Sequence, residues 1–330
     1  MDILLLAISF GVILFGALVF TNAVEWLGRR LEIGEGAVGS LLAAVGTAMP
    51  ETLIPIVAII GGSEGSEDVA VGAIIGAPFL LATLAMALVG LSAHIFKSRR
   101  DQGLKLDADI KTLDRDLLFF LASFSAALVV GLVVPKALHI PLAVVFLLAY
   151  GLYARKTLQG GGDVQEEESI GRLYFDRSPG MKPPTWIVIA QFVVGLGAIV
   201  GGAHLFVEEM ISVAEEIGIE PLVLSLVLAP LATELPEKIN SIFWVREGKD
   251  SLALGNITGA MVFQSMIPIA VGLALTDWEL SRYAVISCAL GLAGGALAYF
   301  TLRLRGRFEW PPVIIWSGMF GAFLAYVLVS

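Results

Sequence analysis

Charged residues are scarce in this sequence. Only 15% of its 330 residues are Asp, Glu, Lys or Arg, whereas 57% are hydrophobic. Soluble domains carry about 25% charged residues, so this chain has too few of them to cover a water-facing surface. The shortage excludes an ordinary soluble enzyme and a disordered chain. The net charge of −9 gives no reason to expect a nucleic-acid partner.

Cysteine and histidine are also rare. The single cysteine, Cys288, lies in an apolar stretch and has no second cysteine with which to form a disulfide within the chain. The three histidines, His94, His139 and His204, are far apart in the sequence, and none has the spacing of a zinc-binding motif. We therefore expect no intrachain disulfide, no zinc site and no resident cofactor.

Long apolar runs are abundant instead. A helix of about 20 apolar residues crosses a lipid bilayer. Ten such segments can be recognised, at residues 3–21, 37–60, 69–96, 117–134, 140–154, 185–207, 221–245, 251–275, 283–302 and 311–329. We predict an all-α membrane protein with ten transmembrane helices. A cytoplasmic linker, residues 155–184, divides it into two five-helix halves, residues 1–154 and 185–330.

Lys and Arg residues are distributed unevenly among the predicted loops. If the N-terminus lies outside, the inside loops hold 18 of these residues and the outside loops hold only Lys136 and Arg282. One further cation, Lys238, lies within a span. Because cytoplasmic loops are enriched in Lys and Arg, this distribution predicts a multi-pass protein of the cell membrane with both termini outside.

The two halves contain an internal repeat. Residues 46–51 read GTAMPE and residues 232–237 read ATELPE, while residues 69–77 and 252–260 share five of nine positions. The offset between the halves is 186 residues at the first motif and 183 at the second. Because five spans is an odd number, the second half must enter the membrane from the opposite side, which makes the repeat inverted. Inverted repeats are typical of secondary transporters.

Two glutamates lie within apolar spans, Glu51 and Glu237, and each directly follows a proline. Proline lacks an N–H group, so the carbonyl four residues earlier loses its helical partner. Each half therefore offers a carboxylate, a hydroxyl and a freed carbonyl within about one helical turn. The set consists of Gly46, Thr47 and Glu51 in the first half and Ala232, Thr233 and Glu237 in the second.

These oxygen groups are the ligands that hard cations such as Ca²⁺ prefer. Two carboxylates match the charge of one divalent cation, and without that cation the pair would hold a proton. The alternative is that each glutamate is protonated and only packs between helices. The recurrence of the Pro-Glu pair in both halves favours a metal site formed by Glu51 and Glu237.

The seventh span carries further polar residues. Glu234 and Lys238 are four residues apart, so they share a helix face and can form an ion pair. Alternatively, Glu234 is a third ion ligand, and the sequence leaves both readings open. In the eighth span we expect Asn256 to be a ligand, with the preceding Gly255 allowing a close backbone approach. For Gln264 the sequence leaves open a ligand role or only a bridge between helices.

These motifs resemble those of the cation/Ca²⁺ exchanger superfamily, which includes the Na⁺/Ca²⁺ exchangers. Each repeat of that family carries a pattern like G-T-S-L-P-E and then one like G-N-x-x-G-S-N. Here they correspond to Gly46–Glu51 and Ala232–Glu237, and to Gly72–Pro78 and Gly255–Met261. The resemblance covers most of the chain. It implies that spans 2, 3, 7 and 8 surround the site and that spans 1 and 6 slide to alternate access.

The resemblance also implies roles for individual residues. Glu51 and Glu237 correspond to the acidic pair that coordinates Ca²⁺, with Thr47 and Thr233 one turn earlier and Asn256 as a polar ligand. The chain departs from the family pattern where Ala73 replaces an asparagine and where Ala48 and Glu234 replace serines.

These observations lead to the prediction of an antiporter. It exchanges Ca²⁺ or a similar cation for Na⁺ or H⁺, and inorganic cations and the lipid bilayer are its expected partners. The departures leave both Na⁺ coupling and H⁺ coupling open. Two other functions remain as alternatives. One is an intramembrane enzyme that uses paired carboxylates as acid and base, and the other is a passive cation channel.

Overall fold

The computed structural model describes residues 1–30, 49–159, 172–176 and 183–329. The side chains of residues 28, 29, 49, 158, 159 and 235–237 lie outside that description. The first half contributes α1 (Asp2–Arg30), α4 (Met49–Gly61), α5 (Ser66–Leu80), the π-helical turn η2 (Leu81–Ala85), α6 (Met86–Ile95), α7 (Ile110–Val133) and α8 (His139–Gln159). The second half contributes α9 (Thr185–Ile217), α10 (Pro221–Arg246), α11 (Asp250–Gln264), α12 (Ile267–Leu275), α13 (Arg282–Arg305) and α14 (Trp310–Val329).

These helices lie over the predicted apolar segments. Within the described residues, eight helical segments are long and apolar enough to cross a bilayer, and two shorter apolar helices cover residues 50–61 and 221–234. Residues 37–48 of the second predicted segment lie outside the description. The α5–η2–α6 segment is one long continuous helix from Ser66 to Ile95.

Burial separates central helices from peripheral ones. In the α5–α6 segment 83% of the most apolar window is buried, and in the α11–α12 segment 67% is buried, whereas in α8 and α14 only 22% is buried. The exposed residues of α8 include Val145, Leu148 and Leu152. Exposed apolar surface on this scale is what a surrounding lipid phase requires. The helices that carry the second motif of each half are therefore at the centre.

The two halves meet where α5 packs against α10. A β-carbon placed on Gly72 would lie 2.5 Å from the carbonyl oxygen of Leu222. Ser225 of α10 also donates a hydrogen bond from its Oγ to the carbonyl oxygen of Val69 in α5, at 2.6 Å. Small residues allow membrane helices to approach this closely because no hydrophobic effect drives helices together in lipid. The repeat-motif glycines of the first half thus position α5 against the second half.

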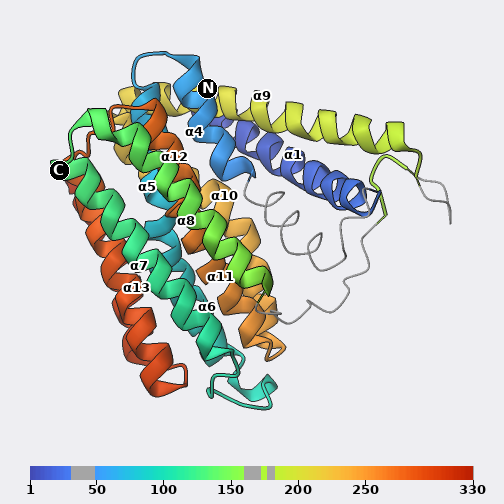
Figure 1. Ribbon diagram of the computed structural model, residues 1–330, viewed down its shortest axis with the longest axis vertical. Helices are drawn as coiled ribbons and strands as arrows, with labels where there is room; N and C mark the ends of the chain where they lie inside the picture. Colours follow the sequence, from blue (N-terminus) through green and yellow to red (C-terminus); the bar gives the residue numbers. More distant parts are fainter. Residues whose placement is uncertain (31–48, 160–171, 177–182, 330) are drawn as a thin grey trace.

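Helices α1 and α9 pack along each other, and together they extend to one side of the remaining helices (Figure 1). Glycines create this contact as well, since a β-carbon on Gly195 would lie 2.6 Å from the backbone nitrogen of Phe20. Buried Gln191 of α9 donates from its Nε2 to Asn22 Oδ1 and to the Val19 carbonyl oxygen of α1, both at 2.9 Å. The first helix of each half therefore packs mainly against its counterpart.

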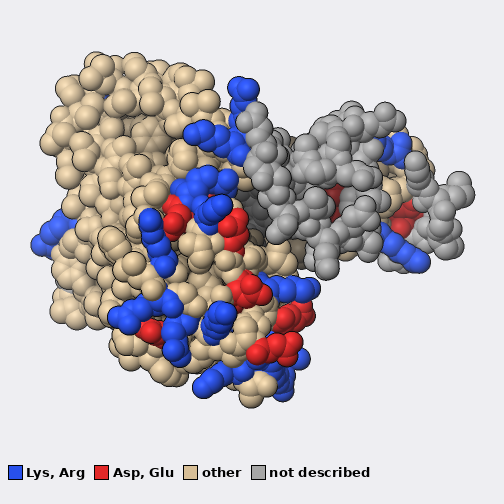
Figure 2. Space-filling model, turned by 60° about the horizontal axis from the view of Figure 1, so that its bottom comes forward, with Lys and Arg blue, Asp and Glu red and all other residues tan. Residues whose placement is uncertain are grey.

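The connections between helices fall at two ends of the bundle. At one end the turn after α6 meets the end of α13, where the Leu106 N–H donates to the Gly306 carbonyl oxygen at 3.0 Å. At the other end the Asp277 N–H donates to Glu67 Oε1 at 2.7 Å, and Lys136 pairs with Asp277. Loops that were predicted to share a side of the membrane thus share an end of the molecule. Charged side chains gather over the first of these ends, beside a broad uncharged surface (Figure 2).

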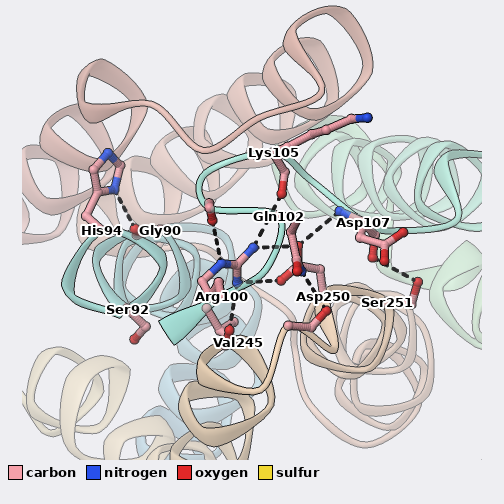
Figure 3. Close-up of polar contacts among 12 residues, drawn as sticks. Gly90, Ser92, His94, Arg100, Gln102, Lys105, Asp107, Val245, Asp250 and Ser251 are labelled. Carbon is pink, nitrogen blue, oxygen red and sulfur yellow. Dashed lines mark hydrogen bonds and ion pairs between the residues drawn. The ribbon is translucent and has the colours of Figure 1, made fainter. Parts of the chain in front are cut away.

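A buried ion pair fixes the α10–α11 turn at that end. The Arg100 guanidinium binds both carboxylate oxygens of Asp250, at 2.7 and 2.8 Å, and both side chains are fully buried (Figure 3). Arg100 also donates to the carbonyl oxygens of Gly103 and Val245, each at 2.7 Å, and the Asp107 N–H donates to Asp250 Oδ2 at 3.0 Å. A bidentate pair with its remaining groups satisfied is the arrangement in which a buried ion pair is stable.

Candidate cation site

Glu51 faces a small cavity between the two halves. Its side chain belongs to α4 and is only 7% exposed. The cavity has a free volume of about 10 Å³, which is on the order of one water molecule or one monatomic ion. Its other walls come from α4, α5 and α10, and consist of Ile54, Ala73, Ala77, Ala229, Pro230 and Thr233. A buried carboxylate beside a largely apolar space requires a cation, a proton or a hydrogen-bond donor next to it.

Small side chains on α5 leave room for this cavity, and α10 supplies polar groups beside it. Ala73 and Ala77 place only methyl groups on the face of α5 that lines the cavity. Thr233 donates from its Oγ1 to the Ala229 carbonyl oxygen at 3.3 Å, one turn back along α10. Pro236 has no N–H to offer to the carbonyl of Ala232, although α10 continues helically through both residues. The cavity is therefore lined by Glu51 from the first half and by Thr233 from the second.

A second polar cluster lies between α10 and α11. Lys238 Nζ is 3.2 Å from Glu234 Oε2 and donates to Asn256 Oδ1 at 2.9 Å. Gln264 Nε2 donates to Glu234 Oε1 at 2.9 Å. Glu234 and Lys238 are each only 1% exposed. The structure thus contains the ion pair that the four-residue spacing allowed, and Gln264 bridges α11 and α10, which is one of the two readings left open for it. Whether Glu234 also binds the transported ion stays a prediction.

The remaining predicted ligands are placed less completely. Gly46 and Thr47 lie outside the described residues, and Glu237 lies in α10 with its side chain outside them. The pairing of Glu51 with Glu237 therefore stays a prediction. Among the described side chains, no group of three or more His, Cys, Asp or Glu residues is arranged to hold a metal ion.

The expected close backbone approach at Gly255, beside Asn256, stays a prediction. No described atom lies within 4 Å of a β-carbon built there, nor at Gly259. Among the described residues, close approach occurs at the equivalent glycines of α5. The positions that the repeat offset relates to Leu222 and Leu226 are 36 and 40, which lie outside the description.

Sequence reasoning missed the polar group that holds the outer face of α11. Asp116, on α7, is 2% exposed and accepts hydrogen bonds from Tyr153 Oη at 2.8 Å and from Thr258 Oγ1 at 3.0 Å. Arg115 also pairs with it, at 3.0 Å. Thr258 lies only two residues after Asn256, so this contact helps to fix the rotation of α11. The position of Asp116 one residue before a predicted span was the only signal in the sequence.

Comparisons with known proteins agree with this architecture. A family model described as sodium/calcium exchanger protein matches residues 1–156 and 187–329. The sodium/calcium exchanger MaX1 of Methanosarcina acetivorans is 25% identical over 340 residues, which covers 85% of this chain and 93% of that protein.

Solved structures are similar as well. The H⁺/Ca²⁺ exchanger CAX superposes with a TM-score of 0.75 at 20% identity, over 99% of this chain and 82% of that one. The sodium-calcium exchanger NCX_Mj gives a TM-score of 0.58 at 20% identity, over 98% and 99% of the two chains. At these identities the likeness establishes a shared fold.

Proposed function

Because this chain belongs to the sodium/calcium exchanger protein family, we propose that it is a secondary active antiporter that exchanges Ca²⁺ or a similar hard cation for Na⁺ or H⁺. One observation carries the proposal. The buried carboxylate of Glu51 faces an ion-sized cavity whose walls come from α4 and α5 of the first half and α10 of the second. A binding site at the interface between repeats is where transporters of this kind hold their cargo.

The charge of the site fits a divalent cation. Glu51 and Glu237 together supply two negative charges, and both follow a proline at equivalent positions of the repeat. Carboxylate, hydroxyl and carbonyl oxygens are the donors that Ca²⁺ takes. When Ca²⁺ leaves, the carboxylates must be neutralised by Na⁺ or by protons, because bare carboxylates within a membrane are costly. Competition for the same two groups is what couples the two fluxes.

The proposal includes ten membrane spans in two inverted repeats, with both termini outside. In support, the described helices overlap all ten apolar segments, the second of them from residue 49 onward, and both ends of the chain are marked in the upper part of Figure 1, away from the turn that follows α6. The loops at the Arg100 end include most of the predicted inside cations, so that end faces the cytoplasm. The α1–α9 pair is the element that would slide across the remaining helices to alternate access.

Ion flux into liposomes tests the function. With purified protein in liposomes, an imposed Na⁺ or H⁺ gradient should drive uptake of radiolabelled Ca²⁺, and the two gradients applied separately identify the counter-ion. Glu51→Gln and Glu237→Gln should each reduce uptake to background, because each removes one charge from the site. Glu216→Gln, at an exposed position of α9, is the matched control and should transport normally.

Two results would contradict the proposal. Intact exchange in Glu51→Gln would show that the cavity is not the cation site. Downhill Ca²⁺ flux that persists without a counter-ion to exchange, at rates far above those of a carrier, would favour the passive channel.

A further inference from the structure

We infer that the Lys238 ammonium is a tethered cation that permanently occupies a monovalent-cation subsite formed by Glu234 and Asn256. This inference rests on the proposed function and deepens it, because Glu234 lies three residues before Glu237 on α10. It assigns Lys238 the role of a specificity-determining residue. The ammonium takes the place of an exchangeable ion and so sets how many charges the site can exchange.

The geometry is that of a coordinated cation. The ammonium lies 3.2 Å from a carboxylate oxygen of Glu234, on its own helix, and 2.9 Å from the amide oxygen of Asn256, on α11. Carboxylate and amide oxygens are the ligands that hard cations take in proteins. Lys238 is 1% exposed, and its four-carbon stem is enclosed together with the charge. Most lysines near a membrane extend their charge toward water, and this one does not.

A comparison of the two halves shows that the charged groups of this cluster occur only in the second half. The second half has Glu234, Lys238, Asn256 and Gln264, and the repeat offsets relate these positions to Ala48, Thr52, Ala73 and Leu81 of the first half. The first-half set contains no charged residue. The second half therefore adds an acid and an ammonium together, with no change in net charge. The addition of one acid together with one ammonium is what we expect of a site in which the chain itself supplies the cation.

The Glu234–Lys238 pair limits the charge that the site can exchange. The covalently attached ammonium cannot leave, so the Glu234 carboxylate contributes no exchangeable charge while Lys238 is in place. The exchangeable charge is then that of Glu51 and Glu237 alone. Gln264 supports this assignment, because its amide donates to the other oxygen of Glu234 at 2.9 Å and holds the carboxylate toward the ammonium.

Removing the tether should convert the subsite into one that binds free cations. In Lys238→Ala the buried Glu234 carboxylate loses its counter-charge, and the vacated space fits a small ammonium ion. We expect purified Lys238→Ala in detergent to unfold several degrees below the wild-type protein. Methylammonium chloride should restore most of that difference relative to choline chloride at equal ionic strength, because a ligand that binds only the folded state stabilises it. Wild-type protein should show no such response.

Two further variants keep the test decisive. Lys238→Ser also removes the charge and leaves the space open, and it replaces the alanine variant if that variant does not fold; it too should be stabilised by methylammonium. The double variant Glu234→Gln/Lys238→Ala removes both charges and should lose the response. The inference is overturned if neither single variant responds to methylammonium, since Lys238 would then only neutralise Glu234.

Transport provides a separate readout. Ca²⁺ uptake by Lys238→Ala in liposomes should fall at least tenfold and recover when methylammonium is present on both sides. If wild-type protein moves no Ca²⁺ at all, the proposed function fails, whereas the stability measurement still tests the subsite. The two failures are therefore distinguishable.

Discussion

Gly76 of α5 lies against the carbonyl oxygen of Leu226 in α10, so closely that a β-carbon on the glycine would be 2.2 Å from that oxygen. Such a distance is far inside van der Waals contact, and the atom in the way belongs to the backbone and cannot rotate aside. The contact joins the second motif of one half to the helix that carries the first motif of the other. The contact also lies next to the cavity that Glu51 faces, because Ala77 of α5 and Pro230 of α10 line that cavity.

Gly76→Ala should therefore separate α5 from α10. Overpacking a tight contact costs about 1–3 kcal/mol, and the cost here should reach the upper part of that range because backbone is involved. We expect a lower unfolding temperature in detergent and impaired Ca²⁺ exchange, since the cavity lies between the same helices. Gly318→Ala is the control, because it lies on exposed α14 with no described atom within 4 Å of the added carbon. Equal stability of the two variants would contradict the packing argument.

The Arg100–Asp250 pair should matter far more for stability than the charged pairs on the surface. Removing one partner of a buried ion pair leaves the other charge uncompensated, which costs about 3–5 kcal/mol. Arg100→Ala and Asp250→Asn should therefore both unfold at clearly lower temperatures than the wild-type protein. Lys249→Ala breaks an exposed pair with Glu247 and should cost about 0–1 kcal/mol. Similar effects at the two pairs would show that the Arg100 network is not a structural anchor.

Asp109 should give the protein a measurable pH dependence outside the membrane. Its side chain caps α7 by accepting from the Lys111 N–H at 3.0 Å and from Thr112 Oγ1 at 2.7 Å. The hydrogen bond from Thr112 holds the pKa of Asp109 below its ordinary value. Because the folded-state pKa is the lower one, the ionised cap stabilises the fold above pH about 4 and loses that contribution as the pH falls through the folded-state pKa.

Two substitutions distinguish the hydrogen-bond acceptor role of Asp109 from the effect of its charge. Asp109→Ala should cost about 1 kcal/mol near neutral pH, because it removes the acceptor. Asp109→Asn keeps an acceptor that does not titrate. We expect wild-type protein to be more stable than Asp109→Asn at pH 7, with the difference shrinking toward pH 3 in thermal unfolding. A difference that does not change with pH would show that the Asp109 charge plays no part.

Several features of this protein were predictable from local sequence. The apolar segments predicted the helices because the thickness of a bilayer and the need to satisfy every backbone group restrict a spanning chain to long apolar helices. The Glu234–Lys238 pair was predictable as one of two readings, because residues four apart on a helix are neighbours whatever else the helix contacts. The repeated Pro-Glu motifs indicated the family for a similar reason, since each motif lies within a single segment.

Other features depended on how separate helices are rotated and at what depth they meet. Nothing near Lys238 in the sequence indicates that its ammonium would reach Asn256 on another helix. Likewise, Gly72 and Gly255 occupy equivalent motif positions, but only Gly72 is pressed against described backbone. The sequence by itself determined which segments are helices and which residues are chemically able to bind a cation. Only the tertiary structure decided which polar groups meet, because a contact between helices depends on relative rotation and offset, and these are set by the packing of all the helices together.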